Sequence, residues 1–262
     1  MMLKALLRDQ TPLIVPDAYD ALSARLIQAS GFKAVQCSGY SMSLAMGAGC
    51  EDDLSFERNL ETTRDICNAV SIPVMADGED GYGPPEIVAR TVEAFIDAGV
   101  EGINIEDQLL RADHKGTIDV SLMAEKLTAA REIAQRRDRP DLVINGRTDA
   151  LAVATDREEG LWEAVTRGRR YLEAGADMVF VTDVTTIAEA KRVVDEIPGP
   201  VSIAAGLPYN ISSLPLKALI SMGPARISLP TVALFSAVHG IKENLAILMR
   251  DENVARCGLD AP

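Results

Sequence analysis

Short apolar runs alternate with longer amphipathic segments along the whole chain. Four of these runs read directly as candidate strands, at Leu13–Val15, Pro73–Ala76, Leu142–Asn145 and Val201–Ala204. Four more follow a small residue and a glycine, a pattern typical of a helix end that leads into a strand. These junctions lie at Ser30–Val35, Ala98–Ile103, Ala174–Val179 and Met222–Ile227. The pattern therefore predicts eight short strands.

The segments between the strands have the length and periodicity of amphipathic helices. They cover residues 18–30, 57–70, 85–98, 120–136, 159–174, 186–196, 212–222 and 231–249. Strands and helices alternate without a linker or a change of composition, which indicates one domain over residues 1–262 with parallel strands. We predict a closed (β/α)₈ TIM barrel, with an open doubly wound α/β sheet as the alternative.

The composition is that of a soluble protein with a large aliphatic core. Hydrophobic residues make up 47% of the 262 residues, charged residues 25% and aromatic residues 4%. The net charge of −13 argues against nucleic acid or an anionic membrane as a partner, because both require a basic surface. The segment Met1–Arg8 is too short and too interrupted for a signal peptide, and no run of about eighteen apolar residues follows it. We predict a cytoplasmic location.

The four cysteines, Cys37, Cys50, Cys67 and Cys257, show no Cys-x-x-Cys spacing. This arrangement suits reduced thiols rather than a disulfide framework or a zinc site. We interpret Cys37 as a small core residue rather than a nucleophile, because no neighbour in the sequence would lower the pKa of its thiol.

Acidic residues follow two of the predicted strands, and active sites of barrels gather at that end of the strands. In Pro73–Gly83 an apolar run breaks into acids and then glycines. Asp77 and Glu79 lie two residues apart, which in extended backbone places both carboxylates on one side. The strand end Gly102–Gln108 adds Glu106. Carboxylates without histidine or cysteine favour Mg²⁺ or Mn²⁺, and Mg²⁺ would bind some of them through water; a solvated acidic turn is the alternative.

Arg147 leaves a strand at the same mouth of the predicted barrel. Its guanidinium could hold a carboxylate or a phosphonate through two parallel hydrogen bonds. An ion pair with Asp149 or Asp107 is the alternative interpretation.

Five ordered segments resemble the successive motifs of the isocitrate lyase/phosphoenolpyruvate mutase superfamily. They are Tyr19-Asp-Ala-Leu-Ser-Ala-Arg25, Cys37-Ser-Gly-Tyr40, Asp77-Gly-Glu-Asp-Gly-Tyr-Gly83, Gly102-Ile-Asn-Ile-Glu-Asp-Gln108 and Gly146-Arg-Thr-Asp-Ala150. The resemblance implies a (β/α)₈ barrel in a homo-oligomer, usually a tetramer that exchanges C-terminal helices. It also implies a Mg²⁺-bound 2-oxo or 2-hydroxy acid and the making or breaking of a C–C or P–C bond.

The resemblance also assigns roles to individual residues. Ser38, Gly39 and Tyr40 would offer hydroxyl and backbone N–H groups to the substrate carboxylate. Asp77 would be the main metal ligand, with Glu79 in a position where many members have Asp. Glu106 would complete the metal shell, and Arg147 would contact the substrate carboxylate or the departing group. The metal would act as a Lewis acid for the enolate that develops as the bond breaks.

Departures from the family pattern limit which reactions of the superfamily we expect. Lyases of the superfamily carry a cysteine loop after the Glu-Asp-Gln strand, whereas Leu109–Thr117 contains no cysteine. Lys115 would supply a cation there and His114 a proton relay, with an exposed mobile loop as the alternative. Glu51 or Asp52 is the candidate for an acid that the family often places before the metal strand.

Two further strand ends differ from the family. Thr182-Asp183 stands where many members have Glu, and Ala204–Gly206 lacks the usual polar residue. These changes suggest a smaller or less polar substrate tail.

The predicted function is Mg²⁺-dependent cleavage of a C–C bond, or a P–C bond, in a small 2-oxo or 2-hydroxy acid through a metal-bound enolate. An oxaloacetate decarboxylase or hydrolase suits the missing cysteine. Three alternatives remain open: a phosphonate enzyme like carboxyvinyl-carboxyphosphonate or phosphoenolpyruvate mutase, a non-catalytic metabolite-binding barrel, and a metal-free aldolase with a Schiff-base lysine. The strands that we predict contain no lysine, which counts against the last.

Overall fold

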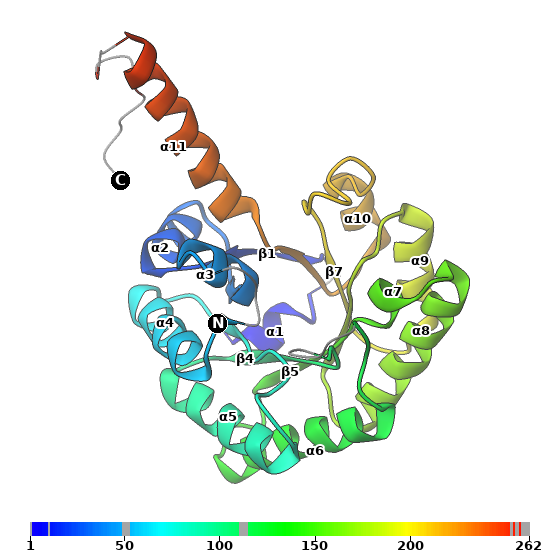
Figure 1. Cartoon of the computed structure of the whole chain (residues 1–262). Helices are drawn as coiled ribbons and strands as arrows, with labels where there is room; N and C mark the ends of the chain where they lie inside the picture. The colour runs from blue at the N-terminus through cyan, green and yellow to red at the C-terminus, as the bar shows by residue number, and fades with distance from the viewer. Residues whose placement is uncertain are drawn as a thin grey trace.

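Eight parallel strands pair in chain order and close into a barrel, as predicted (Figure 1). The computed structural model describes residues 2–9, 11–48, 53–109, 115–251, 254 and 257. The strands are β1 (Leu13–Ala18), β2 (Val35–Cys37), β3 (Val74–Asp77), β4 (Gly102–Glu106), β5 (Val143–Thr148), β6 (Met178–Val181), β7 (Val201–Ala204) and β8 (Arg226–Leu229). Pairing of β8 with β1 completes the ring and excludes the open sheet.

Helices surround the barrel, and most of them match the predicted segments (Figure 1). They are α1 (Leu3–Leu6), α2 (Ala21–Ala29), α3 (Gly39–Ala45), α4 (Phe56–Ala69), α5 (Pro85–Ala98), α6 (Val120–Arg136), α7 (Ala150–Val153), α8 (Arg157–Glu173), α9 (Ile187–Glu196), α10 (Leu216–Met222) and α11 (Val232–Asp251). The short helices α1, α3 and α7 were not predicted, because so few residues cannot establish a period.

Side-chain caps set several of the helix starts. Asp20, Ser55, Asp156 and Thr186 each accept a hydrogen bond from a backbone N–H in the first turn of the following helix. Such a cap satisfies a donor that the helix leaves unpaired. The helix predicted from residue 18 therefore begins only after Asp20.

The four predicted junctions between a helix and a strand are confirmed. Gly31, Gly99, Gly175 and Gly223 all have left-handed backbone, with φ of 89°, 99°, 104° and 82°. Glycine takes this conformation without a steric cost. The chain can therefore leave each helix and enter the next strand within a few residues.

The interior of the barrel changes from apolar to polar along its axis. At the N-terminal ends of the strands, Leu3 and Leu6 of α1 pack with interior side chains in one buried cluster that contains Leu13, Val15, Met75, Val143 and Met178. The strands also carry the buried polar side chains of Gln36, Asn145, Ser202 and Arg226. Acidic residues follow at the C-terminal ends. Helix α1 thus closes the N-terminal end of the barrel, and the acidic groups suited to an active site lie at the C-terminal end.

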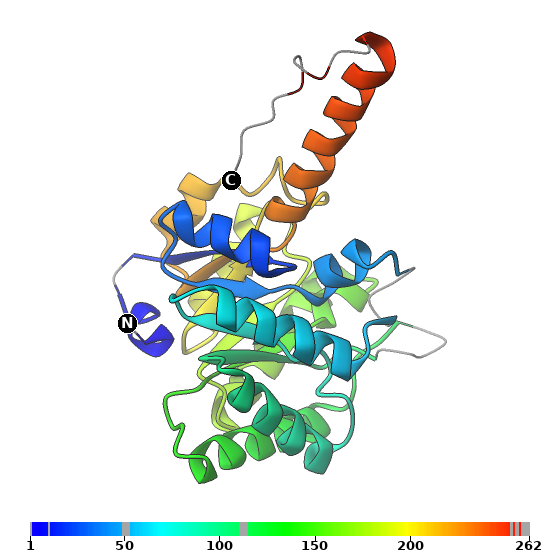
Figure 2. The ribbon, with the colours of Figure 1, turned by 90° about the vertical axis from the view of Figure 1, so that its left-hand side faces the viewer.

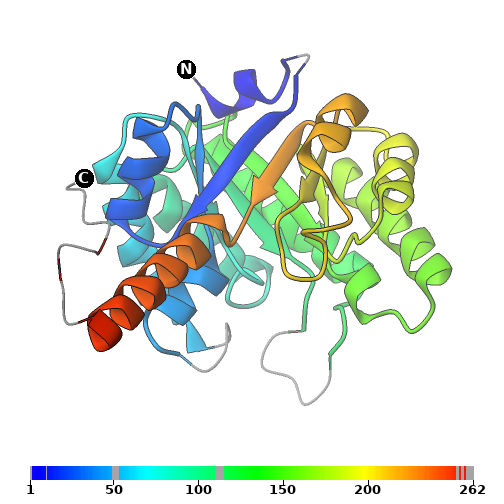
Figure 3. The ribbon, with the colours of Figure 1, turned by 90° about the horizontal axis from the view of Figure 1, so that it is seen from above.

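Helix α11 points away from the barrel in Figures 1 and 2, and in the view from above it lies in the foreground (Figure 3). It carries six exposed large apolar side chains, at Val232, Phe235, Val238, Ile241, Leu245 and Met249. Within the described residues, Val232–Arg250 is also long and apolar enough to cross a membrane, by length and composition alone. Lys242 and Glu243 interrupt the segment, so it is not an uninterrupted run of eighteen apolar residues.

Candidate active site

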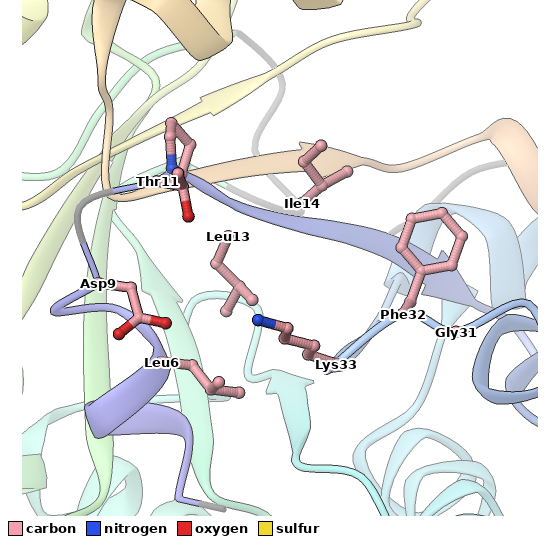
Figure 4. Close-up of a pocket in the computed structure, with 9 residues that line it drawn as sticks. Leu6, Asp9, Thr11, Leu13, Ile14, Gly31, Phe32 and Lys33 are labelled. Carbon is pink, nitrogen blue, oxygen red and sulfur yellow. The ribbon is translucent and has the colours of Figure 1, made fainter.

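A cavity of about 440 Å³ opens at the C-terminal ends of the strands. Each of the eight strands, or the loop that follows it, contributes residues to the cavity wall. The lining residues are Asp17, Gln36, Ser38, Tyr40, Asp77, Asn104, Arg147, Asp149, Ala152, Phe180, Thr182, Asp183, Ala204, Leu207, Pro208, Tyr209, Ser228 and Pro230. Four predicted site residues, Ser38, Tyr40, Asp77 and Arg147, therefore share one cavity. A smaller pocket of about 190 Å³ lies at the opposite end of the barrel, beside Leu13 and Lys33 (Figure 4).

Asp77 ends β3 at the floor of this cavity. Its Oδ2 accepts a hydrogen bond from the Gly39 backbone N–H at 3.0 Å. Its Oδ1 is buried and has no hydrogen-bond partner among the described residues. A buried carboxylate oxygen without a partner is costly in a protein alone, so this atom indicates a ligand.

Glu79 lies beside Asp77, but for a different reason from the one predicted. Its backbone has left-handed geometry, with φ 50°, so the two residues do not form a continuous extended segment. The turn nevertheless brings both carboxylates to Gly39. A Cβ atom on Gly39 would lie 1.8 Å from Glu79 Oε1 and 3.4 Å from Asp77 Oδ2. Only glycine permits this close approach of the chain.

Ser38 precedes Gly39 and caps α3. Its hydroxyl oxygen accepts a hydrogen bond from the Ser41 backbone N–H at 3.1 Å. The hydroxyl hydrogen can still be donated, because a serine hydroxyl both donates and accepts. Tyr40 follows with its side chain 41% exposed. The segment that would bind a substrate carboxylate thus lies directly over the acidic pair.

Glu106 ends β4 opposite Arg147 of β5, as the strand register requires. The Arg147 Nη1 atom lies 2.6 Å from Glu106 Oε2. Its Nε and Nη2 atoms donate to the two oxygens of Asp149 at 2.9 and 3.0 Å. The ion pair with Asp149, the alternative interpretation of Arg147, is therefore present. Arg147 also lines the cavity, so the ion pair and a role in substrate binding are compatible.

Asp107 supports the ion pair between Arg147 and Asp149 through hydrogen bonds to its neighbours. Its carboxylate accepts hydrogen bonds from the Asp149 backbone N–H, the Thr148 hydroxyl, the Tyr171 hydroxyl and the Arg167 guanidinium. Burial raises the pKa of Asp107, and the nearby charge of Asp149 adds to the rise. This network ties α8 to the ends of β4 and β5 and holds Asp149 in place.

Asp17 and Arg226 were not predicted as site residues. Asp17 is the last residue but one of β1 and lines the cavity, and its Oδ1 is buried without a hydrogen-bond partner among the described residues. Burial raises the pKa of Asp17 well above its usual value, while the Arg226 charge opposes the rise. The position of Asp17 at a strand end was the signal that the sequence offered.

Arg226 is fully buried inside the barrel. Its guanidinium donates to Gln36 Oε1, to Ser202 Oγ at 2.8 Å and to Met75 Sδ at 2.8 Å. Burial lowers the pKa of Arg226 to about 10, and the carboxylates of Asp17 and Asp77 counteract that shift. A buried cation beneath the acidic strand ends partly balances their charge.

The wall formed after β6 and β7 combines apolar and polar groups. Thr182 Oγ1 donates to Asp149 Oδ1 at 3.0 Å, and Asp183 is held by Arg157 at 2.6 Å. Burial raises the pKa of Tyr209 to about 12, and the nearby Asp183 charge contributes. Ala204, Leu207 and Pro208 complete this side of the cavity.

Some predicted residues lie away from the cavity or outside the described residues. Lys115 is exposed and does not line the cavity. His114, Glu51, Asp52 and Cys50 lie outside the described residues. The base of the 109–117 segment is fixed, because the Leu109 N–H donates to the Gly116 carbonyl at 2.9 Å. The roles predicted for Lys115 and His114 stay predictions.

The acidic strand ends fit a hard divalent cation that binds partly through water. Within the described residues, no three acidic, histidine or cysteine side chains already form a closed ligand set. Asp77 Oδ1 and Asp17 Oδ1 are nevertheless buried oxygens in need of a partner. Mg²⁺ usually takes one or two carboxylates and keeps several waters, so a closed cage is not required.

Comparison with known proteins supports the family resemblance. The family model described as phosphoenolpyruvate phosphomutase matches residues 3–249. The 2-methylisocitrate lyase of Escherichia coli (strain K12) is 30% identical over 98% of this chain and 86% of that protein.

Two solved structures share the fold over nearly the full length. Oxaloacetate acetylhydrolase in complex with the product oxalate superposes with a TM-score of 0.87 and 27% identity over 100% of this chain and 88% of that one. A phosphonopyruvate hydrolase in complex with oxalate and Mg²⁺ has a TM-score of 0.87 and 26% identity over 99% of this chain and 90% of that one. The chain thus belongs to the phosphoenolpyruvate phosphomutase family and is a lyase-type enzyme of the isocitrate lyase/phosphoenolpyruvate mutase superfamily.

Proposed function

We propose that this enzyme cleaves a C–C bond next to the carbonyl of a small 2-oxo acid, or of the corresponding 2-hydroxy acid, with Mg²⁺ or Mn²⁺ as cofactor. An oxaloacetate decarboxylase or hydrolase is the form of this reaction that we favour. The observation that carries the proposal is the buried Oδ1 of Asp77, which has no hydrogen-bond partner among the described residues at the floor of the cavity.

Asp77 would hold the metal directly, and Glu79 and Glu106 would hold it largely through water. When bound, the cation supplies Lewis-acid stabilisation for the negative charge that develops on the 2-oxo group. The Ser38 hydroxyl would donate to the substrate carboxylate. The Gly39 N–H already donates to Asp77, which keeps that carboxylate oriented toward the cavity.

Arg147 would hold the departing group. Its guanidinium faces the cavity while Glu106 and Asp149 fix its position. A carboxylate on the substrate can form an additional charge-assisted hydrogen bond with this fixed fork. Phe180 packs below, with the Arg147 guanidinium carbon 5.9 Å from the ring centre, and helps to exclude water from that side.

Two features favour an oxaloacetate-like substrate. The 109–117 segment has no cysteine, whereas decarboxylation and hydrolysis need no proton donor at the place where the lyases carry theirs. Two structural relatives were solved with oxalate, a planar dianion shaped like the enolate of pyruvate.

A phosphonate substrate is the second candidate. The likeness to phosphonopyruvate hydrolase favours it, and the Arg147 fork also suits a phosphonate. The Schiff-base aldolase has less support, because the eight strands contain no lysine. A barrel that binds a metabolite without catalysis would show saturable binding and no turnover.

We also propose that the enzyme is a homo-oligomer, a tetramer by family resemblance, in which α11 contacts other subunits. The six exposed apolar side chains of α11 support this proposal, because isolated monomers rarely expose so large an apolar face. The cytoplasmic location and the lack of nucleic-acid and membrane partners stay predictions.

The test is turnover of a panel of 2-oxo acids and phosphonopyruvate by the wild type with Mg²⁺. For whichever acid reacts, Asp77→Ala and Glu106→Ala should each lower kcat/KM by about a hundredfold or more. Glu61→Ala, an exposed acid on α4, serves as the control and should react like the wild type. Retained turnover in Asp77→Ala would contradict the assignment of the metal site.

A further inference from the structure

The segment after β3 adopts backbone geometry that most residues avoid. Glu79 and Tyr82 have φ of 50° and 61°, and Gly81 between them has φ 81°. Non-glycine residues persist in this region only when the surrounding structure holds them there. Since Glu79 is a predicted metal ligand, whatever holds the segment also determines where that carboxylate lies.

Every backbone carbonyl from residue 77 to residue 81 accepts a hydrogen bond, four of them from neighbouring elements and one from within the segment. Four of the five donors are backbone N–H or neutral side-chain groups. The donors are Asn59 Nδ2 to Asp77 at 2.8 Å, the Gly81 N–H to Gly78 at 2.8 Å, the Glu106 N–H to Glu79 at 2.9 Å, Lys126 Nζ to Asp80 at 2.7 Å and Thr91 Oγ1 to Gly81 at 3.1 Å. The exception is an ammonium group.

Lys126 reaches the segment from α6, outside the barrel. It is only 4% exposed, and the hydrogen bond that its ammonium group makes among the described residues goes to the Asp80 carbonyl. Burial lowers the pKa of Lys126, and the charges of Asp80 and Glu106 counteract that shift. Lys126 does not line the cavity. A lysine is rarely buried so deeply without a partner, and here its partner is the backbone next to Glu79.

We propose that Lys126 is a positioning residue of the metal site: its ammonium group holds the Asp80 carbonyl, and so keeps the Glu79 carboxylate beside Asp77 and Gly39. This role rests on the proposed function, since it concerns the metal-binding acids. Because Lys126 does not line the cavity, it would contact neither metal nor substrate. Its positive charge alone would weaken cation binding, so any gain in metal affinity from Lys126 comes from geometry.

The experiment compares Lys126→Ala with the wild type in two measurements. Hydrogen exchange of the metal-free protein reports the order of residues 78–83, and calorimetry reports the affinity for Mn²⁺ alone. Loss of the ammonium should speed exchange in residues 78–83 and weaken Mn²⁺ binding by about tenfold or more. Lys126→Met, which keeps the apolar volume, replaces Lys126→Ala if the smaller side chain prevents folding.

Two controls separate positioning from a general loss of stability. Leu127→Ala removes a fully buried neighbour on the same helix; it should lower the Tm but leave Mn²⁺ affinity within about twofold. Propylammonium matches the atoms that Lys126→Ala removes, so it should restore Mn²⁺ binding, whereas neutral propanol should not.

Unchanged exchange in residues 78–83 of Lys126→Ala would overturn the proposal, as would an equal loss of Mn²⁺ affinity in Leu127→Ala. Failure of the wild type to bind Mn²⁺ would instead contradict the proposed function. The exchange measurement on metal-free protein would still decide whether Lys126 holds the segment.

Discussion

At the scale of single residues, the acids of the site could be predicted from the sequence, but the groups that balance their negative charge could not. Asp77 and Glu106 could be predicted because each terminates an apolar run. Arg226 could not be predicted as a buried site residue. It precedes the apolar residues of β8, where a charged residue is usually read as the solvated end of the preceding helix. Its burial depends on partners that strand pairing brings from distant parts of the chain. The left-handed turn at Glu79 also left no local signature.

Replacement of Arg226 by Met should destabilise the fold by about 3 kcal/mol, because it leaves Asp17 and Asp77 without a buried counter-charge and Gln36 without its donor. Urea unfolding of the metal-free protein measures this change. Arg58→Met is the control: its ion pair with Glu61 is exposed, so its loss should cost less than about 0.5 kcal/mol. A variant as stable as the wild type would show that Arg226 does not balance these acids.

The thiols of Cys37 and Cys67 should resist alkylation in the folded protein. Burial raises the pKa of Cys67 to about 12, and it raises the pKa of Cys37 as well. A raised thiol pKa lowers the thiolate fraction, to roughly 10⁻⁴ for Cys67 at pH 8, and each added pH unit increases it only about tenfold. Peptide-resolved mass spectrometry after iodoacetamide treatment tests this at pH 8 and 9. Labelling of native Cys67 as fast as in urea would refute it.

At the scale of secondary-structure elements, local signals determined most boundaries. Glycines at helix ends and polar caps at helix starts are short-range signals, so the predicted helices agree with the structure within a few residues. The exception, α10, begins at Leu216 rather than at 212 because Pro215 occupies its N-cap. The predicted helices also missed α3, whose first residue, Gly39, is required by contact with β3 rather than by local preference.

Gly39→Ala should disturb the site without unfolding the barrel. The added Cβ would lie 1.8 Å from Glu79 Oε1, so α3 and the Glu79 side chain must separate. We expect Mg²⁺ affinity to fall by about tenfold or more, with a small change in Tm. Gly240→Ala on α11, where a Cβ meets nothing within 4 Å, is the matched control. Equal Mg²⁺ affinity in both variants would show that the contact between α3 and Glu79 does not matter.

At the scale of the whole molecule, strand order was predictable because parallel strands linked by helices have few allowed arrangements. The direction of α11 was not predictable. Its periodicity indicates a helix, but nothing in the periodicity tells whether its apolar face packs on its own barrel. The structure shows that this face is largely exposed, and the proposed subunit contacts rest on the six apolar side chains of α11.

Ile241→Lys combined with Leu245→Lys should lower the oligomeric state while the barrel stays folded. The two side chains are 59% and 56% exposed in the single chain, so the charges cost little there but oppose burial in an interface. Light scattering coupled to size-exclusion chromatography measures the mass. Lys242→Ala with Glu243→Ala on the same helix is the control. An unchanged mass in the double-lysine variant would place the interface elsewhere.

The most direct test of the metal-dependent enolate chemistry is calorimetric titration of the wild type with oxalate, in the presence and in the absence of Mg²⁺. If the acidic strand ends hold the cation and the cation holds the substrate, oxalate should bind tightly with Mg²⁺ and hardly at all without it. Absence of binding in both conditions would contradict the metal site and favour a barrel without this chemistry. Equal binding in both conditions would show that the protein recognises the acid without a metal.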